Sequence, residues 1–79
     1  MSQSVPDTVR QIAADIFDLP VDQITDDMSP QTVADWDSMQ HLNLVLAIEA
    51  RLGARFDPRE IEQMRTIGDT VRIATARAG

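Results

Sequence analysis

The fold of this chain is decided by residues 35–53, which read DWDSMQHLNLVLAIEARLG. Residues 38–52 hold strong helix formers without Gly or Pro, and Gly53 then stands where a helix C-cap is expected. Asp37 precedes this run, and a short acidic side chain there can accept hydrogen bonds from a first helical turn. The stretch therefore predicts a helix over residues 38–52, capped by Asp37, with Ser38 in its first turn.

The predicted helix is apolar over a wide arc. At about 100° per residue, its apolar side chains fall on two stripes. The first stripe consists of Leu44, Val45, Ile48 and Leu52, and the second consists of Met39, Leu42 and Leu46. An ordinary surface helix buries a face of about 100°, and the two stripes together exceed it. Either other helices cover both stripes, or one stripe stays partly open for a ligand or a partner.

Three further helices are predicted from apolar spacing and capping signals. Residues 5–18 predict a first helix, because a first-turn proline, Pro6, is followed by apolar side chains at helical spacing. Asp57-Pro58-Arg59-Glu60 combines a cap, a first-turn proline and a capping-box acid, and it predicts a short helix over residues 58–64. Thr66 and Asp69 repeat this capping pattern before a helix over residues 67–76.

The remaining long segment, residues 20–37, contains two prolines, several acids and isolated apolar residues. It predicts a pinned loop with a short turn at residues 30–34. No segment shows the alternation typical of a strand. We therefore expect an all-α fold over a single domain, residues 1–79, built as a four-helix bundle with a long first connection and a short third helix.

Composition excludes several classes of function. The 79 residues contain no Cys, so disulfides, thiolate metal sites and a catalytic thiol are absent, and the lone His41 with scattered acids does not make a zinc site. The net charge of −6 argues against nucleic acid and favours partners that present Arg or Lys. Since no signal-peptide pattern or membrane-length apolar run is present, we expect a cytoplasmic protein without a membrane segment.

Ser38 can be a helix cap, a nucleophile or an attachment point. A hydrolase serine needs a Gly-x-Ser-x-Gly elbow or a positioned base with an oxyanion hole, and only His41, three residues on, is nearby. Asp35 and Asp37 lack the Gly and the terminal Glu of a calcium loop. Trp36 is interpreted chiefly as a buried anchor for the loop. These comparisons disfavour catalytic and metal roles.

The attachment interpretation comes from the whole series of elements. The tripeptide Asp37-Ser38-Met39 follows a long loop and starts an apolar helix, and a Phe56-Asp57 turn and a last helix introduced by Thr66-Ile67-Gly68-Asp69 come after it. In this order the chain resembles the acyl carrier protein family. The resemblance implies that a phosphopantetheinyl transferase attaches 4′-phosphopantetheine from coenzyme A to the Ser38 hydroxyl. It also implies that the arm carries acyl groups as thioesters and that the protein itself catalyses no reaction.

The flank Trp36-Asp37-Ser38-Met39 differs from the Gly-Ala-Asp-Ser-Leu of many family members and looks more like discrete carriers of specialised pathways. The following helix has a single acid where fatty-acid carriers have several. We therefore expect partner enzymes to dock by apolar contact. For Leu42 and Leu46, burial in the core is an equally good alternative. The expected partner-binding residues are Trp36, Met39, Leu42, Asn43, Leu46 and Glu49.

The resulting hypothesis is a free-standing, monomeric acyl carrier of polyketide, specialised or fatty-acid-like biosynthesis. Its expected partners are the transferase and acyl- or aminoacyl-loading and transferring enzymes such as ligases, ketosynthases or acyltransferases. An aminoacyl or peptidyl carrier remains open, as does an unmodified helical adaptor from another class of protein.

Overall fold

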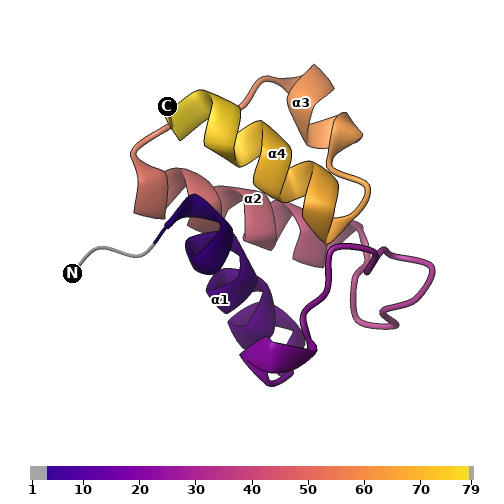
Figure 1. The fold of residues 1–79 in the computed structure, drawn as a ribbon. Helices are drawn as coiled ribbons and strands as arrows, with labels where there is room; N and C mark the ends of the chain where they lie inside the picture. Colours follow the sequence, from indigo (N-terminus) through magenta and orange to yellow (C-terminus); the bar gives the residue numbers. More distant parts are fainter. Residues whose placement is uncertain (1–3, 79) are drawn as a thin grey trace.

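The computed structural model describes residues 4–78 and contains four α-helices and no strand in that range (Figure 1). The helices are α1 (Val5–Phe17), α2 (Ser38–Leu52), α3 (Pro58–Gln63) and α4 (Ile67–Ala78), and a short 3₁₀ helix, η1 (Val21–Gln23), lies in the first loop. The predicted all-α fold with a long first connection is confirmed. No helix in the described range is both long and apolar enough to span a bilayer.

The observed helix ends differ slightly from the predicted ones. α1 ends at Phe17 because Asp18 takes a left-handed conformation, with φ of 57°, and its N–H donates to the Ala14 carbonyl. α3 ends at Gln63, because Met64 leaves the helical region with ψ of 69°. α4 extends to Ala78, two residues beyond the predicted end. The η1 turn was not predicted, since a single 3₁₀ turn leaves little pattern in a sequence.

α1 is the centre of the bundle and packs against both α2 and α4 (Figure 1). Its start is capped by Ser4, whose hydroxyl accepts from the Asp7 N–H at 3.3 Å. Its buried face includes Val9, Ile12, Ala13 and Phe17. The 3.6-residue repeat of this helix thus supplies one wall of the core.

α2 buries only one of its two apolar stripes. Its buried residues are Leu44, Val45 and Ile48. On the other stripe the exposed fractions are 74% for Met39, 51% for Leu42 and 53% for Leu46. Of the two arrangements compatible with the sequence, the open stripe is the one that occurs. The core alternative for Leu42 and Leu46 is wrong, because no helix within residues 4–78 covers that face.

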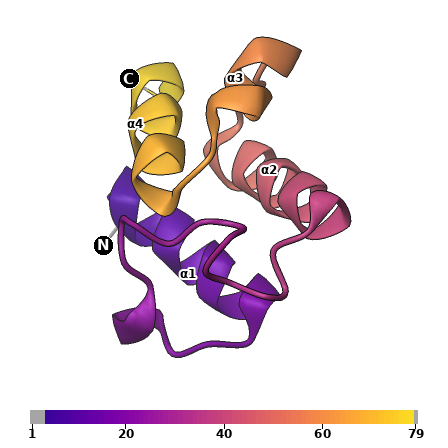
Figure 2. The same ribbon diagram turned by 90° about the vertical axis from the view of Figure 1, so that its right-hand side faces the viewer.

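The long loop is fastened to the bundle by its own buried side chains and by backbone hydrogen bonds. Ile24, Val33 and Trp36 are buried in the core cluster. The Ile67 N–H donates to the Met28 carbonyl at 3.0 Å, so the loop passes the start of α4 before reaching α2 (Figure 2). The predicted turn near residues 30–34 is present, with the N–H of Thr32 and of Val33 donating to the Ser29 carbonyl.

None of the residues of α3 is fully buried, although Ile61 packs partly buried against the core. The expected capping box between Asp57 and Glu60 is formed. The Arg77 guanidinium of α4 forms a two-pronged ion pair with Glu60, with its shortest N–O distance at 2.7 Å. The packing of Ile61, this ion pair and a hydrogen bond to His41, described below, together position α3.

Candidate attachment site

The start of α2 leaves the Ser38 hydroxyl exposed. Asp37 is the N-cap in an extended conformation, and its carboxylate Oδ1 accepts from the Gln40 N–H at 2.9 Å. Ser38 is then the first helical residue and lies at the surface. The first N–H groups of a helix have no partner within the helix and carry the positive end of its dipole. The site therefore combines an exposed hydroxyl with the N-terminal end of a helix, where the Gln40 N–H is already bonded to Asp37.

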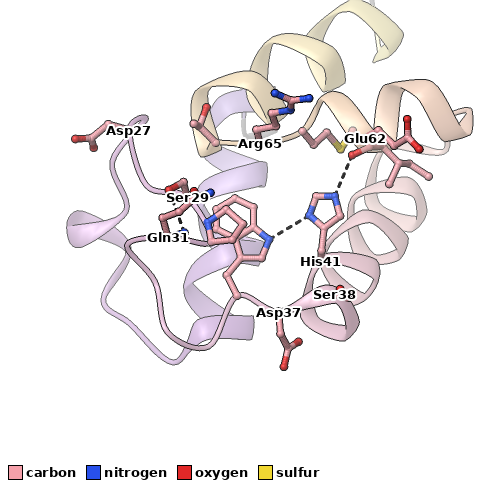
Figure 3. Close-up of a pocket in the computed structure, with 13 residues that line it drawn as sticks. Asp27, Ser29, Gln31, Asp37, Ser38, His41, Glu62 and Arg65 are labelled. Atoms are coloured by element: carbon pink, nitrogen blue, oxygen red, sulfur yellow. Dashed lines mark hydrogen bonds between the residues drawn. The ribbon is translucent and has the colours of Figure 1, made fainter.

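Beside Ser38, Trp36 and His41 form a hydrogen-bonded pair. The Trp36 indole N–H donates to His41 Nδ1 at 3.1 Å, and the two rings stack with centroids 6.0 Å apart. Because Nδ1 accepts, the proton of the neutral ring is on Nε2, which donates to the Ile61 carbonyl at 3.0 Å (Figure 3). Both nitrogens of His41 are thus engaged, and the ring is not available as a base for Ser38. This geometry removes the one partner that a serine hydrolase mechanism had in the sequence.

A hollow of about 880 Å³ adjoins Ser38 and lies between the loop, the start of α2 and the segment that joins α3 to α4 (Figure 3). Its size falls in the range of about 300–1,000 Å³ common for small-molecule sites. It is lined by Asp27, Ser29, Pro30, Gln31, Trp36, Asp37, Ser38, His41, Ile61, Glu62, Met64, Arg65 and Thr66. An attached group at Ser38 therefore has a surface recess next to it.

The expected partner-binding residues divide into two groups. Met39, Leu42 and Leu46 are exposed on one face of α2, and we call them the apolar stripe. Asn43 is also exposed, and its side-chain amide donates to Gln40 Oε1 at 2.9 Å. These four side chains are accessible to a partner.

Trp36 and Glu49 require correction. Trp36 is only 2% exposed because its ring packs against Phe17, with centroids 5.2 Å apart. Glu49 is half-buried, and its Oε2 accepts from the Phe56 N–H at 2.8 Å, so its carboxylate fastens the turn after α2. The structure assigns both residues to holding the fold, and neither stands free on the surface.

Sequence reasoning did not identify the role of several lining residues. Ile61 and Met64 fall within the predicted third helix, but their position at the hollow depends on where α3 lies relative to α2. Arg65 and the loop residues Ser29 and Gln31 carried no motif that would have marked them. Among residues 4–78, no three His, Asp or Glu side chains gather as potential metal ligands.

Comparison with known proteins agrees with this geometry. Residues 7–73 match the family model described as phosphopantetheine attachment site. The chain is 28% identical over 71 residues to polyketide-8 synthase acyl carrier protein 2 of Streptomyces avermitilis, covering 90% of this chain and 82% of that one. It is also 28% identical over 71 residues to an acyl carrier protein of Lactobacillus acidophilus, covering 90% and 89% of the two chains.

The fold is similar to the solution structure of a holo acyl carrier protein from Geobacter metallireducens, with a TM-score of 0.82 and 23% identity. The match covers 95% of this chain and 86% of that one. Carriers of this family hold 4′-phosphopantetheine covalently, receive it from a phosphopantetheinyl transferase and catalyse no reaction themselves. Since the family model spans residues 7–73, this chain belongs to the phosphopantetheine-binding acyl carrier proteins.

Proposed function

We propose that this carrier holds its 4′-phosphopantetheine arm on Ser38 and delivers acyl thioesters to enzymes of a polyketide or related specialised pathway. The observation that carries the attachment proposal is the division of roles at the start of α2. Asp37 supplies the cap, and the adjacent Ser38 hydroxyl stays exposed beside the hollow.

The residues around Ser38 fit a phosphodiester. No acidic residue follows Ser38 in the first turn of α2, so the capping carboxylate of Asp37 is the one acidic group that the cap and first turn of α2 contribute. The Asp37 carboxylate is engaged with the Gln40 N–H. When attached, the arm supplies a thiol, which the chain itself lacks because it has no Cys. The part of this protein is then to anchor the arm, stabilise its phosphate and present it to partners.

The proposal of a specialised pathway rests on the surface of α2. The only acid of α2 is Glu49, and its carboxylate is tied to the Phe56 N–H. Charged rims mainly raise association rates and set partner choice. Because α2 presents little negative charge, docking of loading and transferring enzymes depends on the apolar stripe. One of the relatives bears the name of a polyketide synthase carrier, which is consistent with this proposal.

The carrier function is tested by loading the protein from acetyl-coenzyme A with magnesium and a broad-specificity transferase, followed by intact mass measurement. We expect one addition of an acetylated arm, from which hydroxylamine removes the acetyl group and leaves the arm. A protein whose mass does not change would instead be an unmodified helical adaptor. Separate loading by candidate ligases, with fatty acids and with amino acids, then decides between an acyl and an aminoacyl carrier.

A further inference from the structure

The floor of the hollow beside Ser38 is closed by hydrogen bonds that join three elements. We use the word floor for Trp36, His41, Ile61 and Met64, which all line the hollow. Trp36 belongs to the long loop, His41 to α2 and Ile61 to α3, and the hydrogen bonds run from the indole through the imidazole to the Ile61 carbonyl (Figure 3). The loop, α2 and α3 are therefore fastened together directly next to the attachment residue.

The floor is also the outer boundary of the core. Trp36 and Met64 are each 2% exposed and belong to the same buried cluster as Leu44, Ile48 and Ile67, which are fully buried. Protein interiors are packed about as densely as organic crystals, so extra carbon atoms need new space. A long acyl chain can enter between α2 and α3 only if the floor opens.

Opening the floor breaks a fully satisfied set of polar groups. In the described range, no buried side-chain nitrogen or oxygen lacks a hydrogen-bond partner. Displacing His41 leaves the Trp36 indole N–H without its present acceptor and removes one of the two donors to the Ile61 carbonyl, which keeps its hydrogen bond from the Met64 N–H. Apolar groups inserted there cannot replace these hydrogen bonds, so the insertion is opposed by desolvated polar groups as well as by packing.

The rim of the hollow has a different character. Asp27, Gln31, Glu62 and Arg65 line it and are exposed. Short or polar groups at this rim keep contact with water and with polar side chains, whereas a long alkyl chain there would stay hydrated. The hollow is thus polar at its rim and apolar at its closed floor, and it offers no enclosed apolar sleeve for a long alkyl chain.

We infer that Trp36 and His41 are specificity-determining residues that keep the cargo in the surface hollow, so that this carrier holds short or polar acyl groups and does not bury a long alkyl chain. The inference rests on the proposed attachment at Ser38. It adds a limit on the class of acyl group that the carrier holds.

The test compares acetyl-, butyryl- and octanoyl-loaded forms of the wild-type protein. Intact mass first verifies loading, so that a failure of attachment is recognised separately from a failure of this inference. We expect the three forms to share one melting temperature, the same methyl resonances for Leu44 and Ile48, and the same emission from Trp36, the single tryptophan. An octanoyl form that melts more than about 4 °C higher, with shifted core methyl resonances, would overturn the inference.

Substitution of the barrier gives the complementary result. In His41→Ala we expect octanoyl loading to raise the melting temperature above that of the acetyl form and to shift the Leu44 and Ile48 methyl resonances. The control is Gln63→Ala, which changes an exposed residue of α3 outside the hollow and should respond to chain length as the wild type does. If His41→Ala shows no chain-length response, His41 is not the barrier. If that variant does not fold, the wild-type series decides alone.

Discussion

The carboxylate of Asp37 accepts from the Gln40 N–H at 2.9 Å, and the neighbouring Ser38 hydroxyl is thereby left exposed at the first position of α2. Asp and Ser are both good N-cap residues, but here Asp37 caps α2 and Ser38 stays exposed. The extended backbone of Asp37, with φ of −99°, turns its side chain back over the first turn. Ser38 then projects beside the hollow, where an attached group meets the surface.

Asp37→Ala should destabilise the protein by about 0.5–2 kcal/mol, because the Gln40 N–H loses its acceptor. Asp37→Asn keeps an oxygen acceptor and should remain close to the wild type. The free energies of unfolding in urea measure both effects. Equal stability of Asp37→Ala and the wild type would show that the cap contributes nothing to α2.

Leu46→Ala should change stability by less than about 0.5 kcal/mol, because Leu46 is 53% exposed. Ile48→Ala, two residues on and fully buried, should cost about 2–5 kcal/mol. The same Leu46 variant should slow transfer of cargo to a cognate enzyme, since the apolar stripe is the proposed docking surface. A large loss of stability with unchanged transfer would show that Leu46 is a core residue and not part of a docking surface.

The ion pair between Glu60 and Arg77 makes the stability of the fold depend on pH. The pKa of Glu60 is held below its ordinary value of 4.5, chiefly by the hydrogen bond from the Arg77 side chain and then by the Asp57 N–H. A carboxyl with a lowered folded pKa contributes stability above its unfolded pKa and loses it as pH falls through the folded pKa. Glu60→Gln should therefore melt below the wild type at pH 7, and this difference should shrink at pH 3.

Glu62→Gln is the matched control for this pH series, because Glu62 is an exposed acid of the same helix and forms no ion pair within residues 4–78. Its melting temperature should follow that of the wild type at both pH values. A Glu60→Gln difference that stays constant from pH 7 to pH 3 would exclude the ion pair as its cause.

Trp36→Phe should loosen α3, although α3 contains neither Trp36 nor His41. Phenylalanine preserves an aromatic contact with Phe17 but removes the indole N–H that donates to His41 Nδ1. With that nitrogen left without its donor, we expect a loss of about 1–3 kcal/mol and faster amide hydrogen exchange in α3 than in α1. Unchanged exchange in α3 would mean that its position does not depend on the tryptophan.

The sequence predicts the features that depend on neighbours along the chain. The caps at Asp37 and Asp57, and the Thr66 hydroxyl that accepts from the Asp69 N–H at 3.0 Å, are local and were expected. The exposure of Leu42 and Leu46 was left open, because a helical wheel separates the faces but does not say which one other helices cover. That choice is made by α1, which packs on the other side of α2.

Contacts between segments that lie far apart in the sequence could not be predicted from neighbouring residues. The hydrogen bond from His41 to Ile61 joins residues 20 positions apart, and the Met28 carbonyl meets the Ile67 N–H across the whole of α2. No residue type or spacing encodes these partners. The hollow beside Ser38 arises from such contacts, and for that reason Arg65 and Gln31 were recognised only in the folded protein.

Attachment of the arm at Ser38 is tested most directly by the intact mass after incubation with coenzyme A, magnesium and a broad-specificity transferase. The mass is measured for the wild type, Ser38→Ala and Ser29→Ala. Ser29 is the matched control because it is a second serine that lines the same hollow. We predict a single phosphopantetheine addition in the wild type and in Ser29→Ala and none in Ser38→Ala. An addition that persists in Ser38→Ala, or that is lost in Ser29→Ala alone, would contradict it.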